Sequence, residues 1–262
     1  MERRRFLQGM VLTGLLGVAQ VRADAGISIG SAINKAGRQR MLSQRMAKAY
    51  VMRLLEVNPS FALQLQDQSG QLFETQLSEL RTLQPTPEIR GALDTLEAAW
   101  QSYRAILKKS PIAANLPALM TESERTLVAA HALTGLYEKQ SATPAGRLVN
   151  VSGRQRMLSQ RLAKCYFLRE AGIRSEPLNA ELSKANQEFV AALDLLTKAP
   201  ENTPEIRQDL QLASMQWLFF DQALNGARQV REQALRNVAT TSERILEVMD
   251  GVTGRYERLV RA

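Results

Sequence analysis

The sequence contains little of what most enzyme and metal sites are built from. Its 262 residues include one cysteine, Cys165, and one histidine, His131. A single cysteine excludes an internal disulfide and a cysteine-rich zinc site, and a single histidine excludes a multi-histidine metal centre. The 5% aromatic content and the nine prolines argue against an all-β chain full of turns. We therefore expect a helical protein that is not an enzyme, with no catalytic residues, no metal and no cofactor.

The first 25 residues have the composition of an export signal. Three arginines at 3–5 precede Phe6-Leu7 and a moderately apolar run over 10–21, and Ala23-Asp24-Ala25 offers a cleavage site. The arginine pattern resembles a twin-arginine signal. The alternative is an uncleaved anchor, for which the apolar run is short. No later segment has about 18 consecutive apolar residues, so we expect a soluble, periplasmic mature chain.

The formal net charge of +8 is basic, which raises the question of partners. An exported protein rarely meets nucleic acid, and no nucleic-acid-binding motif is present. We therefore expect no nucleic acid, and we consider a small anion, an acidic protein or anionic lipid instead. A surface that is basic only for solubility is the remaining interpretation.

The chain is a tandem repeat. Residues 34–50 and 150–166 are identical at 13 of 17 positions, at an offset of 116. Further blocks recur in the same order, and their offset drifts from 116 to 119. They pair 86–90 with 203–207, Trp100 with Trp217, 123–125 with 242–244 and 137–138 with 256–257. Several separate blocks repeated in order indicate two copies of one structural unit.

Each unit is predicted to be a four-helix bundle. Asn58-Pro59, Thr86-Pro87, Thr143-Pro144 and Thr203-Pro204 each place a capping side chain before a proline, as at helix starts. The helices are predicted near 27–57, 59–84, 87–109, 114–140, 144–172, 176–199, 204–227 and 229–260. The fold class is therefore all-α, with a signal peptide at 1–25, one bundle at 26–142 and a second at 143–262.

An arginine lies in the middle of an apolar stripe in each repeated helix. At about 100° per residue, Arg40 and Ser43 share a narrow face with apolar residues, and Arg156 and Ser159 do the same in the second copy. An unpaired guanidinium there needs a carboxylate, water or an anion. The opposite face, which carries Met41, Arg45 and Met52, is also partly apolar, so we expect the helix to pack against two neighbours.

Two interpretations of these arginines stay open at this point. In the structural one, Arg40 and Arg156 pair with acidic side chains or extend to water. In the functional one, they converge on an anion as forked donors. The glycines at 37 and 153, one turn before each arginine, indicate a close approach of helices, because glycine inside a helix costs about 1 kcal/mol relative to alanine.

The pattern Asn-x-x-Gly-x-x-Arg-Met-x-x-x-Arg at 34–45 resembles the first-helix box of bacterial nitrate sensors of the NarX and NarQ type. It is more similar still to the PilJ-type domain, the N-terminal domain of type IV pili methyl-accepting chemotaxis transducers. The resemblance implies a periplasmic four-helix bundle. In the nitrate sensors, box arginines from two subunits clasp one anion. The resemblance thus implies Arg40 and Arg156 as the main anion-binding residues and Arg45 and Arg161 as second donors.

The leading hypothesis is a sensor-type binding protein for a nitrate-like oxyanion or another small anion. Its ligand-binding residues would be Arg40, Arg156, Arg45, Arg161, Ser43 and Ser159. A membrane receptor or a pilus protein would read the change in bundle packing, and a homodimer is also considered. The alternative hypothesis is an adaptor for pilus, chemotaxis or envelope components that has no small-molecule ligand and docks through the face with Met41, Arg45 and Met52.

Overall fold

The computed structural model describes residues 27–83, 86–226 and 230–261, so the predicted leader lies outside the described residues. This described part folds into eight α-helices and one 3₁₀-helix, with no strand, and the all-α prediction is confirmed. The helices are α1 (Ile29–Leu54), α2 (Pro59–Thr82), α3 (Pro87–Leu107), η1 (Ala113–Asn115), α4 (Leu116–Ser141), α5 (Pro144–Glu170), α6 (Glu176–Thr197), α7 (Pro204–Asn225) and α8 (Arg231–Arg261).

Threonine side chains cap three of the four helices that were predicted to begin at a proline. Thr86, Thr143 and Thr203 each accept a hydrogen bond from the backbone N–H three residues later. The predicted cap at Asn58 is wrong. Asn58 has a left-handed backbone, with φ 46° and ψ 58°, and its side chain makes no capping bond to α2. Asparagine tolerates this conformation, which lets the chain turn sharply between α1 and α2.

These two kinds of helix start should respond differently to substitution. We expect Thr86→Ala to lower the free energy of unfolding by about 1 kcal/mol, because the Ile89 N–H loses its acceptor. Asn58→Gly should instead leave it unchanged or raise it by about 0.5 kcal/mol, since glycine adopts positive φ without strain. Urea unfolding of both variants measures the difference. Equal losses in the two variants would show that Asn58 also caps its helix.

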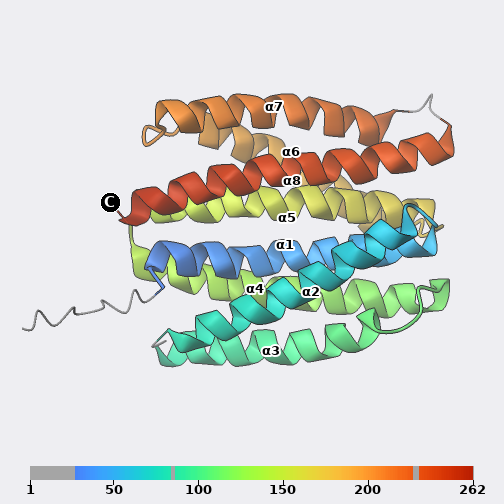
Figure 1. Cartoon of the computed structure of the whole chain (residues 1–262), viewed down its shortest axis with the longest axis horizontal. Coiled ribbons are helices and arrows are strands. Elements are labelled where there is room, and N and C mark those ends of the chain that lie inside the picture. Colours follow the sequence, from blue (N-terminus) through green and yellow to red (C-terminus); the bar gives the residue numbers. More distant parts are fainter. Residues whose placement is uncertain (1–26, 84–85, 227–229, 262) are drawn as a thin grey trace, which may run out of the picture.

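The eight α-helices form two bundles whose long axes run side by side (Figure 1). In the first bundle, α1 packs against α2 and α4, and α3 packs mainly against α4. In the second bundle, α5 packs against α6 and α8, and α7 packs mainly against α8. The pattern of packing is thus repeated along with the sequence.

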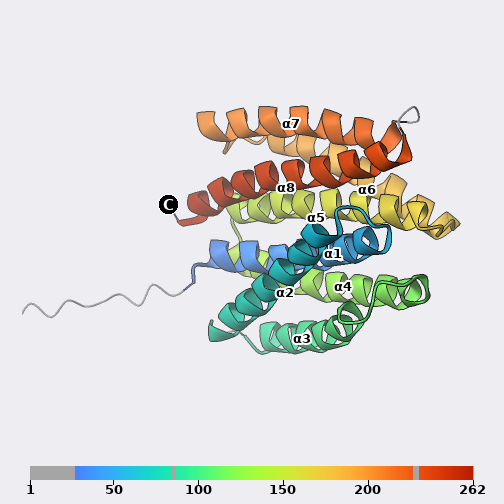
Figure 2. The same ribbon diagram turned by 45° about the vertical axis from the view of Figure 1, so that its right-hand side comes forward.

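The first helices of the two bundles, α1 and α5, lie against each other in the middle of the molecule (Figures 1 and 2). Twenty of the 26 residues of α1 and 18 of the 27 residues of α5 are buried, against 7 of 21 in the outer helix α3. One continuous apolar core therefore extends through both bundles. The prediction that the repeated helix packs on two sides is confirmed, and the face with Met41 and Met52 is buried inside the chain.

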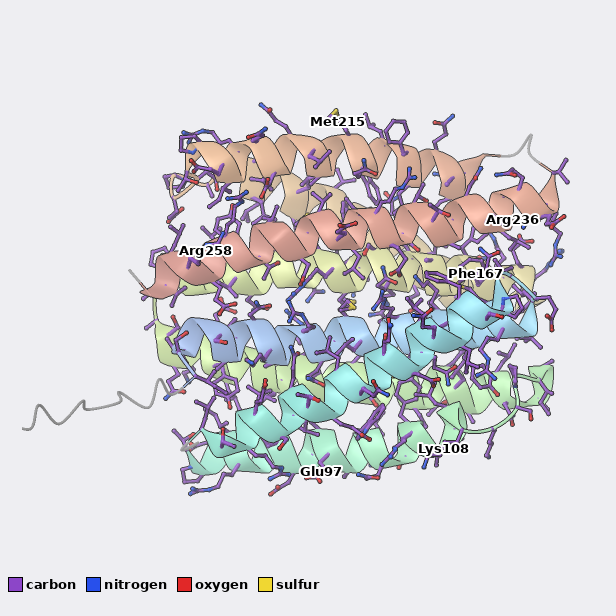
Figure 3. The ribbon with its side chains drawn as sticks, viewed as in Figure 1. Glu97, Lys108, Phe167, Met215, Arg236 and Arg258 are labelled. Carbon is purple, nitrogen blue, oxygen red and sulfur yellow. The ribbon has the colours of Figure 1, made fainter. Side chains whose placement is uncertain are left out.

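The tryptophans are equivalent core residues, as the repeat predicts. Trp100 stacks on Phe73 with ring centroids 4.4 Å apart, and Trp217 stacks on Phe189 at 4.2 Å. Outer faces carry side chains such as Glu97 on α3 and Met215 on α7 (Figure 3). None of the helices in the described part is long and apolar enough to cross a membrane.

Candidate functional site

The repeated glycines leave room for the two guanidinium groups between α1 and α5. A Cβ atom at Gly37 would lie 3.0 Å from Nη2 of Arg40. A Cβ atom at Gly153 would lie 3.2 Å from Nη2 of Arg156 and 3.5 Å from Nη2 of Arg40. Both guanidinium groups therefore approach Gly153, and the structure brings the two predicted anion-binding arginines together across the interface between the bundles.

The Arg156 guanidinium is fully buried and has a carboxylate partner in its own bundle. Its Nη1 forms an ion pair with Asp250 on α8, and its Nη2 donates to Oδ1 of Asn34 at 2.8 Å. Asp250 also accepts from Nη2 of Arg38 at 2.7 Å. In the second copy, the buried charge is thus neutralised within the protein.

The Arg40 guanidinium is equally buried, with 1% of the residue exposed, but its partners are neutral. Its Nη1 lies 3.3 Å from Nδ1 of His131, its Nη2 donates to the backbone oxygen of Asn150 at 3.2 Å, and its Nε donates to the oxygen of Gly37 at 3.4 Å. Among the described residues, no carboxylate lies within ion-pair distance of Arg40. A buried cation held only by long hydrogen bonds to neutral groups is costly.

The electrostatic environment of the two arginines follows from burial and from their neighbours. Burial lowers the pKa of Arg40 to about 9, the nearby Arg154 and Arg156 contribute to that decrease, and Glu138 opposes it. Burial also lowers the pKa of Arg156 to about 10, against the attraction of Asp250. Both groups are still cations at neutral pH. The site around Arg40 is therefore a buried positive region whose charge is poorly solvated.

His131 contributes a titratable group at the solvent edge of this region. The residue is exposed, yet its Nδ1 faces Arg40. Partial burial of its ring lowers the pKa of His131, and the positive charges of Arg40 and Arg154 lower it further. Because the arginine is always the donor, Nδ1 is the acceptor, and the imidazole is neutral in this arrangement.

The second box arginines connect the bundles to each other. Arg45 on α1 forms an ion pair with Glu243 on α8, and Arg161 on α5 forms one with Glu124 on α4 at 2.9 Å. Arg161 also contacts Glu181 at 2.7 Å. Since 45 matches 161 and 124 matches 243 in the repeat, these are reciprocal contacts between the bundles. Both predicted second donors thus already have carboxylate partners.

The two serines of the predicted site are hydrogen-bonded within their own helices. Ser43 Oγ donates to the backbone oxygen of Arg40 and Ser159 Oγ donates to that of Arg156, both at 2.8 Å. Each hydroxyl therefore fixes the turn that carries the arginine. Within the described residues, no group of three or more His, Cys, Asp or Glu side chains is placed to hold a metal ion.

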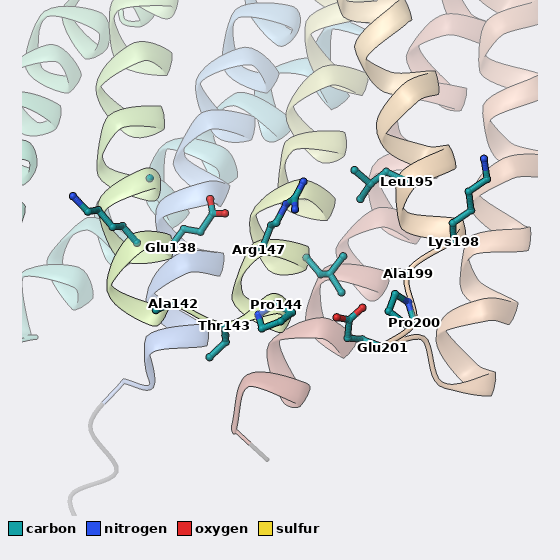
Figure 4. Close-up of a pocket in the computed structure, with 13 residues that line it drawn as sticks. Glu138, Ala142, Thr143, Pro144, Arg147, Leu195, Lys198, Ala199, Pro200 and Glu201 are labelled. Carbon is teal, nitrogen blue, oxygen red and sulfur yellow. The ribbon is translucent and has the colours of Figure 1, made fainter.

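A cleft of about 740 Å³ lies where the two bundles join. It is lined by the end of α4, the start of α5 and the end of α6, with Glu138, Arg147 and Lys198 among its charged residues (Figure 4). Gly135 and Glu138 line it, and they follow His131 by four and seven residues on α4, so the three share one face of that helix. The residues that line the cleft do not include Arg40 or His131, so the cleft is separate from the Arg40 region.

Sequence reasoning alone does not place His131 and Asp250 at this site. Its alanine and leucine neighbours favour a packed or surface role for the histidine, and no local pattern singles out the aspartate. The available signal is the repeat itself, because the offset of 119 that pairs Tyr137 with Tyr256 also pairs His131 with Asp250. That alignment identifies one position at which the copies differ in charge.

The fold and the site together define a class: a tandem helical-bundle protein with one buried arginine box in each copy. The chain belongs to the PilJ family, described as the type IV pili methyl-accepting chemotaxis transducer N-terminal domain, which matches residues 28–127 and 139–243. Domains of this family are periplasmic sensory domains rather than catalytic ones, and they act in chemotaxis and pilus signalling. Comparison with curated proteins and comparison with solved structures each gave no match.

Proposed function

We propose that this protein is a non-catalytic periplasmic sensor that binds a small, nitrate-like oxyanion at Arg40, between its two bundles. The observation that carries the proposal is the fully buried Arg40 guanidinium, which contacts only neutral groups in the described structure. An anion held by a forked guanidinium would form charge-assisted hydrogen bonds and offset the cost of burial. The resemblance to the arginine box of nitrate sensors supports the same ligand class.

The position of the site gives the anion a means of changing the structure. The groups around Arg40 come from three helices, with His131 on α4, Asn150 on α5 and Arg40 itself on α1. An anion that bound these groups would alter the contact between α1 and α5, where the bundles meet. A ligand that prefers one packing arrangement shifts the population toward it. A pilus or chemotaxis component would then read that shift.

The other predicted site residues take supporting roles in this proposal. Arg156 lies next to the site and increases its positive potential, although Asp250 already occupies one side of its guanidinium. Arg45 joins α1 to α8 through Glu243, and Arg161 joins α5 to α4 through Glu124. Ser43 and Ser159 fix the helical turns that carry the arginines.

A thermal-shift screen tests the proposal. The protein would be melted with nitrate, nitrite, sulfate and acetate at constant ionic strength, which gluconate maintains as a bulky reference anion. We expect at least one small oxyanion to raise the melting temperature, and Arg40→Ala to abolish that increase. Stabilisation by none of the anions, or an unchanged increase in Arg40→Ala, would contradict the proposal.

A second candidate function, as an adaptor, is favoured by one surface. The face predicted for docking, with Met41 and Met52, is buried, but α7 exposes an apolar stripe at helical spacing. Its members are Leu212, Met215, Leu218 and Phe219, where the first copy has Thr95, Ala98, Gln101 and Ser102. Retention of a pilus or chemotaxis protein by the wild type, lost in Leu218→Ser/Phe219→Ser, would support the adaptor. Equal retention would exclude this stripe.

A further inference from the structure

The two copies make reciprocal contacts across the interface between the bundles. Asn150 on α5 donates to Glu138 on α4, and Asn34 on α1 donates to Glu257 on α8 at 2.6 Å. These residues are repeat partners, since 34 matches 150 and 138 matches 257. The interface therefore has approximate two-fold symmetry, so each side shows how the other would be arranged with the same residues.

The symmetry fails beside the buried arginines, where the first copy has His131 and the second has Asp250. Asp250 reaches the Arg156 guanidinium and forms an ion pair with it. His131 reaches the Arg40 guanidinium from the equivalent place on α4 and supplies no negative charge. Since the aspartate side chain is 44% exposed and the histidine residue is also exposed, each stands between a buried arginine and solvent.

The asparagine contacts of the two buried arginines also differ between the copies. Arg156 donates to Oδ1 of Asn34 at 2.8 Å. The matching Oδ1 of Asn150 is buried and finds no hydrogen-bond partner in the described structure, because Arg40 donates to the backbone oxygen instead. In the first copy, the Arg40 guanidinium is thus held by hydrogen bonds of 3.2–3.4 Å, and it faces the neutral ring of His131.

We infer that the Asp250 carboxylate is a built-in anion that fills the second copy, so that the chain binds one anion, in the first copy, with His131 as its second donor. The inference rests on the proposed function and deepens it. The Asp250 carboxylate takes the place of a ligand, because it contacts Arg156 from the side on which a bound oxyanion would contact Arg40. An anion entering from solvent would displace the His131 ring from Arg40 and accept hydrogen bonds from the guanidinium and from the Nε2–H group of the neutral ring.

Exchanging the two residues tests the inference, because each variant converts one copy into the other. Isothermal titration with potassium nitrate, and separately with potassium sulfate, gives the number of anions bound per chain. We expect one site in the wild type. His131→Asp should weaken binding by about 10- to 100-fold or more, because the new carboxylate occupies Arg40. Asp250→His should raise the number of sites to two.

The control and the outcomes separate the two proposals. His131→Asn removes the ring without adding charge, so it should weaken binding less than His131→Asp does. His131→Asp should also melt at a higher temperature than the wild type without ligand, which shows that it folds. Full affinity in His131→Asp, two sites in the wild type, or a single site in folded Asp250→His would overturn the inference while leaving the proposed function intact. No binding of either anion by the wild type, together with no stabilisation by any anion of the thermal-shift screen, would overturn the proposed function itself.

Discussion

Glu243→Gln is expected to lower the free energy of unfolding at neutral pH by about 3 kcal/mol, more than any other single substitution that we propose. Glu243 on α8 pairs with Arg45 and with Lys48 of α1, and the Lys48 ammonium is completely buried. Glutamine would remove the negative charge and leave that ammonium with neutral acceptors, the glutamine amide oxygen and the Ser242 hydroxyl, 3.2 Å away. An unpaired buried cation is far costlier than a lost surface contact.

The pH dependence of this effect follows from the pKa of Glu243. Burial alone would raise that pKa, but Lys48 and Arg45 lower it to about 2, below the ordinary value of 4.5. A carboxyl group with a depressed folded-state pKa stabilises the fold fully above its unfolded-state pKa. The contribution is lost as the pH falls from about 4.5 toward about 2. The difference in the free energy of unfolding between the wild type and Glu243→Gln should therefore disappear as the pH falls across that interval.

Urea unfolding of both proteins at pH 7 and pH 3 measures this difference. Glu124→Gln is the matched control, because Glu124 is the repeat partner of Glu243. Its side chain is 41% exposed, and Arg161 would keep its second partner, Glu181. We expect the control to cost less than about 1 kcal/mol. Equal losses in the two variants at pH 7 would show that Glu243 is only a surface ion pair.

Asp250→Ala should cost about 2–3 kcal/mol, the second largest effect. It removes the only carboxylate partner that the described structure gives to the buried Arg156. The expected cost lies below the roughly 3–5 kcal/mol typical of breaking a fully buried pair, because water can reach the half-exposed position of Asp250. For a chain of this size, the melting temperature should fall by roughly 5–10 °C.

A thermal melt of Asp250→Ala beside two controls tests this prediction. Asp94→Ala breaks an exposed pair with Arg81 and should cost less than about 1 kcal/mol. His131→Ala changes the equivalent position of the first copy, where no ion pair is lost, and should also have a small effect. If Asp250→Ala melted like its controls, Arg156 would not depend on Asp250 for its charge balance.

The helices could be predicted from the sequence because their signals are local. Each of the four helix starts predicted at a proline is observed. The prediction failed at Asn58 because asparagine is favoured both as a helix cap and in the left-handed backbone conformation. The local sequence around Asn58 does not distinguish these two roles.

The site was only half predictable, because its partners come from distant parts of the chain. The helical stripe placed Arg40 and Arg156 in the interior, and the structure buries both. The stripe could not show that α1 of one bundle faces α5 of the other, or that His131 and Asp250 follow their arginines by 91 and 94 residues. The asymmetry between the copies depends on those tertiary contacts and on one exchanged residue.

The proposed anion site implies that Arg40 is retained at the expense of stability, and Arg40→Met separates binding from stability. Methionine fills similar volume without charge, and replacing an uncompensated buried charge by a packed apolar side chain is neutral or stabilising. The measurement is the melting temperature of wild type and Arg40→Met, each without and with the oxyanion that gives the largest shift. We predict that Arg40→Met melts at the same or a higher temperature than the wild type without anion and shows no shift with it. A variant that is several degrees less stable than the wild type, yet keeps the full anion shift, would contradict an anion site at Arg40.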